Sequence, residues 1–251
     1  MEARIEQCLG ELSPGSRLVR TWPLNGGISA AMTAFEVEHP NGLLQKMVAR
    51  QPSPYRFSRN NRAAQTEFQV LTTLKEAGLP VATPLCVEST AEPFLVLEYI
   101  DGRPELSPTD VSGYLQRYAE QLARIHSMEP MTFLPSQDRG YGPRRESLND
   151  SLREGEIRDA LEAIGEASRR NPLRLCHGDF WPGNVLWRDG EIAGVIDWEE
   201  VLAGEPLADL GICRLDLWWI LGEEASNEFT ERYRALVPYD FSDLPDRKSV
   251  V

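Results

Sequence analysis

The sequence predicts an α+β fold of two lobes, in which an antiparallel sheet with one helix precedes a mainly helical region. The first observation behind this prediction is the pair Asn41-Gly42, which lies between two strand-like runs and is a strong hairpin signal. The second is a change of the apolar period to that of a helix after residue 105. We expect an N-terminal lobe over residues 1–100, a hinge turn at 101–104 and a helical C-terminal lobe over 105–245.

The first lobe is expected to contain two hairpin strands, one helix and one buried strand. The strands at 33–38 and 44–50 flank the Asn-Gly turn. Over 65–77, apolar residues recur every three positions and Gly78 follows as a C-cap candidate, which predicts a helix. Residues 93–100 are typical of a buried strand.

The second lobe is expected to be helical around a short strand-loop-strand region. An apolar stripe ending at His126 predicts a helix in which this histidine is a packing residue. A polar loop is predicted over 130–150 and a charged helix over 152–167. Residues 207–219 are apolar nearly all round, which predicts a helix buried at the centre of the lobe.

Charge and composition exclude some classes of function. The apolar fraction of 41% and the charged fraction of 26% are ordinary for a globular protein. A net charge of −13 argues against a nucleic-acid partner. The same charge favours a cationic substrate, although acidic surfaces most often only maintain solubility.

The cysteine spacing and the lengths of the apolar runs indicate in which cellular compartment the protein is expected. The four cysteines show neither a CxxC pair nor a Cys/His metal spacing, so we expect reduced thiols in the cytoplasm. No apolar run is long enough to span a bilayer, so no membrane association is expected. Residues 246–251 lack periodicity and can be encoded by a common sequencing adapter. We therefore expect that residues 246–251 are a non-native tail and that the natural reading frame was truncated before them.

One short stretch concentrates polar residues that suit phosphoryl transfer. His177, Asp179 and Asn184 lie on one loop, and Asp197 ends the apolar strand that follows. An aspartate can accept a proton from a hydroxyl, while an amide oxygen and a second carboxylate suit Mg²⁺. Transfer of a γ-phosphoryl group depends on such positioned groups.

At these residues the sequence resembles the aminoglycoside phosphotransferase superfamily, whose members share the protein-kinase-like fold. His177-Gly178-Asp179 with Asn184 is similar to its catalytic loop, and residues 196–199 are similar to its metal-binding segment. Residues 204–210 resemble a following segment whose aspartate is usually structural. The resemblance covers about residues 20 to 235. It implies ATP and Mg²⁺ as cofactors, Asp179 as the base, and Asn184 and Asp197 as metal ligands.

The resemblance also implies a nucleotide site in the first lobe. Residues 24–30 are similar to the nucleotide-covering loop, with backbone and hydroxyl donors at Gly26, Gly27 and Ser29, although Gly-Gly also fits an ordinary turn. Arg50 stands where protein kinases carry a phosphate-binding lysine, with Lys46 as the alternative.

Three further residues complete that predicted nucleotide site. Glu67 matches the acidic partner of Arg50, or is a solvated helix residue. Glu98 and Ile100 resemble the hinge whose backbone meets the adenine. His177 is expected to orient its loop by hydrogen bonding.

Three classes of function remain open at this point. An active small-molecule kinase acting on a hydroxyl is favoured over a nucleotide-binding pseudokinase or an inactive truncated fragment. A hydrolase ranks last because the three histidines are not paired at metal spacing. The acceptor is unidentified, and the acidic region 216–231 fits either a pocket for a cation or a solvated helix face. The sequence does not indicate an oligomeric state.

Overall fold

The computed structural model describes residues 1–24, 30–88, 93–136, 155 and 171–242. The chain divides into two compact units. One contains Met1–Glu105 with Gly183–Glu199, and the other contains Leu106–Pro182 with Glu200–Val251. The predicted division had placed all of 105–245 in one lobe, so the segment Gly183–Glu199 groups differently.

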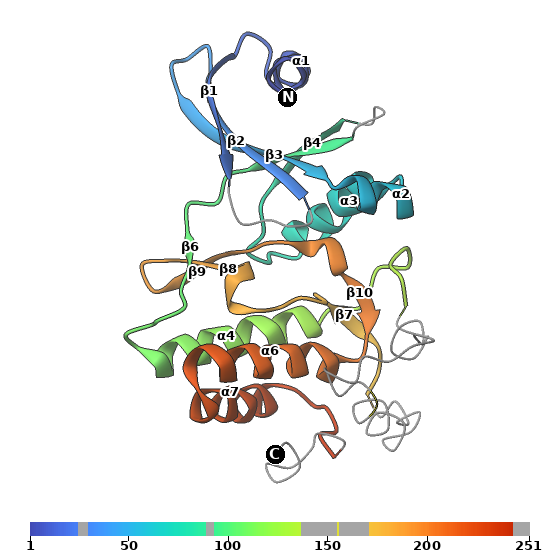
Figure 1. Cartoon of the computed structure of the whole chain (residues 1–251), viewed down its shortest axis with the longest axis vertical. Coiled ribbons are helices and arrows are strands. Elements are labelled where there is room, and N and C mark those ends of the chain that lie inside the picture. The colour runs from blue at the N-terminus through green and yellow to red at the C-terminus, as the bar shows by residue number, and fades with distance from the viewer. Residues whose placement is uncertain (25–29, 89–92, 137–154, 156–170, 243–251) are drawn as a thin grey trace. The chain divides into compact units, whose positions relative to one another are not determined.

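The first unit is built on a five-stranded antiparallel sheet with the strand order β1-β2-β3-β5-β4 (Figure 1). Its strands are β1 (Arg17–Leu24), β2 (Ala30–Glu38), β3 (Leu44–Pro52), β4 (Pro84–Glu88) and β5 (Phe94–Glu98). The predicted Asn-Gly hairpin is the β2–β3 connection, where Gly42 has a φ of +80°. That left-handed conformation suits glycine, which has no Cβ to clash.

The helices of this unit are α1 (Glu2–Leu12), α2 (Pro54–Arg59) and α3 (Ala63–Glu76). The sequence predicted α3, and Gly78 ends it with a φ of +76°. The backbone N–H of Leu79 then donates to the carbonyl of Leu74 at 2.9 Å, as in a Schellman motif.

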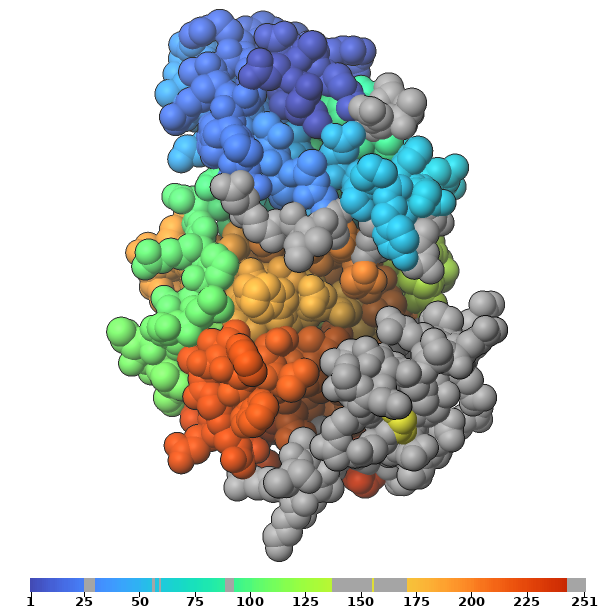
Figure 2. Space-filling view, in the orientation of Figure 1, coloured from blue at the N-terminus to red at the C-terminus, as the bar shows by residue number. Residues whose placement is uncertain are grey.

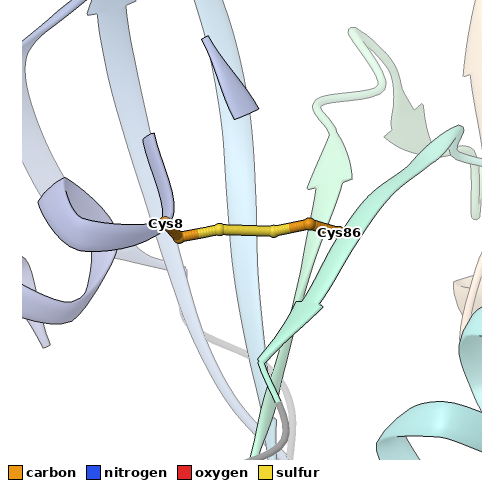
Figure 3. Close-up of a disulfide and its surroundings, with 2 residues drawn as sticks. All are labelled: Cys8 and Cys86. Carbon is orange, nitrogen blue, oxygen red and sulfur yellow. A yellow bond between two sulfur atoms is a disulfide. The ribbon is translucent and has the colours of Figure 1, made fainter. Parts of the chain in front are cut away.

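The core of the first unit lies where α1 meets the sheet. Ile5 and Leu9 are buried with Phe35 and Phe94 in one apolar cluster. Cys8 belongs to the same cluster and Cys86 packs against it. The two form a disulfide between α1 and β4 (Figure 3). The expectation of four reduced thiols was therefore wrong for this pair, because the fold brings together two cysteines that are far apart in the sequence.

A three-stranded sheet in the order β6-β8-β9 completes the first unit. Its strands are β6 (Arg103–Pro104), β8 (Val185–Arg188) and β9 (Glu191–Val195). The predicted hinge turn at 101–104 therefore ends in a short strand that pairs with β8. The backbone N–H of Val195 also donates to the carbonyl of Pro80 at 2.7 Å. These pairings explain why Gly183–Glu199 groups with the first unit.

The second unit packs helices together beside a small two-stranded sheet (Figure 1). Its elements are α4 (Val111–His126), β7 (Arg174–Cys176), β10 (Leu202–Gly204), α6 (Pro206–Leu221) and α7 (Glu223–Leu236). Helices α6 and α7 pack against each other, and both belong to the orange-red part of the surface in Figure 2. Asp110 caps α4 by accepting the backbone N–H of Gly113 at 2.9 Å.

The prediction that the helix around 207–219 is buried on all sides was wrong. Leu210, Cys213 and Leu217 form a buried face of α6. By contrast, Trp218 is 53% exposed and Trp219 is 83% exposed. Uniform apolar composition concealed the direction of the buried face, because it leaves no polar stripe to mark the solvent side.

Several predictions concern other parts of the chain. Most of the loop at 130–150, the helix predicted at 152–167 and the tail at 246–251 lie outside the described residues. Among the described helices, none combines the length and the apolar character needed to cross a bilayer.

Candidate functional site

In the second unit, the loop after β7 is held by one carboxylate. Asp209, in the first turn of α6, accepts the backbone N–H of His177 at 2.6 Å and that of Gly178 at 2.9 Å. It is only 2% exposed. Hydrogen bonds to an ionised acceptor are among the stronger ones in proteins. Asp209 thus fixes the backbone immediately before Asp179.

Asp209 is itself held by a buried histidine. His126 Nε2 lies 3.2 Å from Asp209 Oδ2, and His126 Nδ1 lies 2.6 Å from the hydroxyl of Tyr233 on α7. Burial raises the pKa of Asp209, but hydrogen bonds and charges from His126, His177 and the Gly178 backbone outweigh burial and lower it overall. His126 therefore links α4, α6 and α7 behind the loop and is more than a packing residue.

The far side of Asp179 is fixed through Phe180. The carbonyl of Phe180 accepts the Tyr118 hydroxyl at 3.1 Å and the Cys213 thiol at 2.9 Å. The Phe180 ring is fully buried and stacks on Tyr118 with centroids 4.8 Å apart. Asp179 therefore lies between two anchored residues.

His177 is fully buried, and its Nδ1 accepts the backbone N–H of Asp179 at 3.3 Å. A hydrogen bond of this kind is what His177 would need in order to orient its loop. Gly178 has a φ of +83°, and a Cβ there would lie 2.4 Å from the carbonyl oxygen of Glu200. The loop therefore needs glycine at this position.

Asp216, also on α6, is a second acid beside Asp179. Its side chain is partly buried. Burial and the charge of Asp179 both raise the pKa of Asp216. The charge of Asp179 therefore acts on Asp216, which the sequence analysis had placed only within the acidic region 216–231.

In the first unit, Arg50 on β3 is the centre of a buried charge cluster. Its Nε lies 2.8 Å from Glu67 Oε1 on α3, and its Nη2 lies 2.8 Å from Asp197 Oδ1 and 2.9 Å from Glu199 Oε2. Burial lowers the pKa of Arg50, but the charges of the three carboxylates outweigh burial and raise it. The structure therefore brings together the predicted residues Arg50, Glu67 and Asp197.

Asn184 and Asp197 lie at the open end of the β8–β9 hairpin. Val185 pairs with Val195, and the backbone N–H of Ile196 donates to the carbonyl of Asn184 at 2.9 Å. Asp197 has a φ of 64°, a conformation that costs energy outside glycine and that clusters at functional sites. One amide oxygen and one carboxylate at neighbouring positions are a donor set that fits Mg²⁺.

The remaining predicted nucleotide residues lie elsewhere in the first unit or outside the described residues. Glu98 ends β5 and accepts the hydroxyl of Thr83. Ile100 packs against Gly194, where an added Cβ would meet its side chain at 2.4 Å. Lys46 lies 5.6 Å from the ring centroid of Tyr99, so Arg50 and not Lys46 joins the acidic cluster. Gly26, Gly27 and Ser29 lie outside the described residues.

The sequence left some residues of these clusters unassigned. Glu199 lies two positions after Asp197, in the segment 196–199 that resembles the metal-binding segment of the family. This position could have suggested Glu199 as a site residue. His126 was predicted only as a packing residue and Asp216 only as part of the acidic region 216–231, because the residues with which they interact are distant in the sequence. The acidic region 216–231 divides in two: Asp216 lies by the loop, and the glutamates line a hollow of about 430 Å³ on α7, formed by Glu223, Glu224, Asn227, Glu228 and Glu231.

Comparison with known proteins assigns the chain that carries these clusters to a family. Residues 22–240 match the model of the phosphotransferase enzyme family. The human acyl-CoA dehydrogenase family member 11 is 27% identical over 203 residues, which are 70% of this chain and 26% of that protein. A homoserine kinase from Gluconobacter oxydans (strain 621H) is 28% identical over 138 residues, which are 48% of this chain and 42% of that protein.

Solved structures support the predicted fold class. The ternary complex of the aminoglycoside phosphotransferase APH(2")-IIa with streptomycin and ATP has a TM-score of 0.62 and 18% identity, over 93% of this chain and 82% of that chain. This similarity confirms an α+β fold of the kinase-like kind. The family match spans most of the sequence. The chain therefore belongs to the phosphotransferase enzyme family.

Proposed function

We propose that this protein is a kinase that uses ATP and Mg²⁺ to phosphorylate a hydroxyl group of a small molecule. The observation that carries the proposal is the buried contact of Arg50 with Glu67 and Asp197. A permanently charged, forked donor beside a candidate metal ligand suits a site for polyphosphate. The relative that phosphorylates homoserine and the similar fold bound to ATP support an alcohol acceptor and this nucleotide. A reaction that consumes ATP also supports the cytoplasm as the place of action.

In the proposed reaction, Asp179 accepts the proton of the acceptor hydroxyl. The hydroxyl oxygen forms a bond to the γ-phosphorus, the bond from that phosphorus to the β–γ bridging oxygen breaks, and ADP leaves. The hydrogen bonds from His177 and Gly178 to Asp209 support a fixed position for this base. A positioned base contributes catalysis because little reorganisation is then needed during transfer.

Arg50 is proposed to bind the phosphates, with Glu67 setting its orientation through the contact at Nε. Asn184 and Asp197 are proposed to hold Mg²⁺, which neutralises phosphate charge when bound. The backbone at Glu98 and Ile100 and the segment with Gly26, Gly27 and Ser29 are proposed to contact the rest of the nucleotide.

The decisive experiment compares Asp179→Asn with the wild type in a coupled assay of ATP consumption over a panel of small alcohols. We expect turnover to fall by about 10² to 10⁴-fold, the range for losing a general base. Binding of Mg-ATP, measured by calorimetry, should persist in the variant. If the wild type binds Mg-ATP but forms no phosphorylated product from any acceptor, the pseudokinase alternative would be supported. Activity without ATP would favour a hydrolase.

A further inference from the structure

A tyrosine of α7 begins a series of buried polar contacts that leads to the loop at 177–180. Helix α7 packs against both α4 and α6 (Figure 1). The hydroxyl of Tyr233 lies 2.6 Å from His126 Nδ1 on α4, and His126 Nε2 lies 3.2 Å from Asp209 Oδ2 on α6. Asp209 in turn accepts two backbone N–H groups of the loop. The series therefore starts on a helix that contributes no residue to the loop itself.

The side chain of Tyr233 is held in place for this contact. It is fully buried. Its ring meets that of His126 edge to face with centroids 5.7 Å apart, and it also packs against Phe229 and Phe241. In the part of the chain that the structure describes, the hydroxyl makes its one hydrogen bond to His126. Burial raises the pKa of Tyr233, so the phenol keeps its proton and remains a hydrogen-bond donor.

The direction of these hydrogen bonds depends on which nitrogen of His126 carries the hydrogen. A neutral imidazole has one N–H donor and one acceptor. The pKa of Asp209 is lowered overall, so its carboxylate is ionised and can only accept. The nitrogen that faces it, Nε2, is therefore the donor. Nδ1 is then the acceptor, and the hydroxyl of Tyr233 donates to it.

We propose that Tyr233 is a positioning residue for phosphoryl transfer: its hydroxyl holds Nδ1 of His126, so that the Nε2–H group stays directed at Asp209 and the loop keeps Asp179 in position. The hydrogen bond at one nitrogen of a histidine sets the tautomer and orientation of the other. Without the hydroxyl, the ring is anchored at one nitrogen only, and Asp209 loses a donor whenever the ring turns. The inference rests on the proposed function, because the position of Asp179 affects turnover only if this residue acts on the acceptor.

Two conservative variants separate this role from packing. Tyr233→Phe removes the hydroxyl and retains the buried ring. Tyr239→Phe is the matched control, because the hydroxyl of Tyr239 donates to the backbone carbonyl of His126 at 2.8 Å. The control thus removes a phenolic hydrogen bond to the same residue and leaves both ring nitrogens untouched.

The first measurement is nitrogen-15 NMR of the His126 ring. The chain has three histidines, and a His39→Asn variant helps to assign their signals. In the wild type and in Tyr239→Phe, we expect Nε2 to carry the hydrogen and Nδ1 to have the chemical shift of a hydrogen-bonded acceptor. In Tyr233→Phe, the Nδ1 signal should move to the shift of a free acceptor.

The second measurement is hydrogen exchange of the His177 and Gly178 amides, which donate to Asp209. In Tyr233→Phe these two amides should exchange about fivefold faster, the equilibrium factor for the loss of one ordinary hydrogen bond. Amides in the middle of α4 should keep their wild-type rates, which distinguishes a loosened loop from a loosened fold.

The third measurement is turnover over the panel of alcohols. In Tyr233→Phe, kcat should fall about 10 to 100-fold, the range for outer groups that orient a working side chain. The KM for Mg-ATP should stay nearly unchanged, because the residues proposed to bind it belong to the other unit. Tyr239→Phe should keep the wild-type kcat.

A wild-type His126 with a hydrogen on Nδ1, in a neutral or a charged ring, overturns the inference even if Tyr233→Phe does not fold. So does a Tyr233→Phe protein that keeps the wild-type kcat, or a Tyr239→Phe protein that loses as much. The proposed function fails separately. A shifted Nδ1 signal and faster loop exchange in Tyr233→Phe, with no phosphorylated product from the wild type and any alcohol, would retain Tyr233 as a support of the loop and reject the kinase.

Discussion

Arg50 carries one positive charge and contacts three carboxylates. Its charge offsets the free-energy cost of burying the carboxylate of Glu67. Arg50 is 6% exposed and Glu67 is 7% exposed. Removing one partner of a buried pair leaves an uncompensated charge, which costs far more than the pair itself stabilises. The cluster is therefore a point where one substitution affects both the fold and the proposed phosphate site.

We predict that Arg50→Met lowers the free energy of unfolding by about 3–5 kcal/mol, the range for a broken buried ion pair. Denaturation in urea measures the effect. Arg20→Met is the matched control, because Arg20 also pairs with a glutamate, Glu36, at 2.9 Å but from an exposed position. Its cost should stay below about 1 kcal/mol. Equal costs for the two variants would show that the Arg50 cluster is not effectively buried.

A second prediction concerns acid and Asp209. The pKa of Asp209 is lower in the folded protein than its ordinary value, so this group contributes stability above the unfolded pKa, about 3.9. That contribution is lost as the pH falls through the folded pKa. In Asp209→Asn the carboxylate is absent, so the free energy of unfolding should fall less steeply below about pH 4 than in the wild type.

Urea denaturation in steps from about pH 6 to about pH 3 gives both slopes. The variant should also lose turnover, because a single amide oxygen cannot replace both oxygens that accept from His177 and Gly178. Parallel slopes for the two proteins would mean that Asp209 is not held in its ionised form by the folded state.

At the scale of elements, the conformation of the loop at 177–180 depends on its close approach to Glu200. Gly178→Ala combines a positive φ with a Cβ only 2.4 Å from a carbonyl oxygen. We predict a loss of more than about 2 kcal/mol of stability, since the left-handed conformation alone costs roughly 1–2 kcal/mol. The variant should also lose activity.

The β8–β9 turn contains the control for that prediction. Gly190 has a φ of +80°, and a Cβ at this position would meet no heavy atom within 4 Å. Gly190→Ala therefore tests the backbone conformation without the steric contact. Thermal unfolding of both variants separates the two costs, and equal losses would refute the role of the Glu200 contact.

Elements whose signals are local could be predicted from the sequence. The Asn41-Gly42 hairpin and the helix ending before Gly78 depend on neighbouring residues, and both are present. The exposed side of α6 and the pairing of β6 with β8 depend on contacts between distant segments. No periodicity encodes such contacts, which is why the prediction of a helix buried on all sides was wrong.

The candidate site follows the same rule. Motif spacing identified the loop with Asp179 and the segment with Asp197, and β3 placed Arg50 near Glu67. His126 was assigned only to packing, because its partner Asp209 lies 83 residues away. Short motifs thus predict candidate site residues, whereas the groups that hold these residues in place come from the tertiary fold.

At the scale of the whole molecule, the chain passes between the two units three times, after Glu105, Pro182 and Glu199. The first unit therefore consists of two segments that are separated in the sequence by most of the second. Arg50 comes from one segment and Asp197 from the other. A ligand that binds both residues should stabilise the two segments together.

This leads to a prediction for Mg-ATP. At about a hundred times its dissociation constant, a ligand that binds only the folded state adds about 2.7 kcal/mol to the free energy of unfolding. We expect a rise in the thermal midpoint with Mg-ATP, together with slower hydrogen exchange in both β3 and the β8–β9 hairpin.

Asp197→Asn and chelation of the metal by EDTA should each remove most of the rise, since both take away the proposed metal site. Asp179→Asn should retain it, because the proposed base belongs to the other unit. Protection that is the same with EDTA, or that appears in β3 alone, would argue against a metal held by Asp197 and in favour of phosphate binding by Arg50 without it.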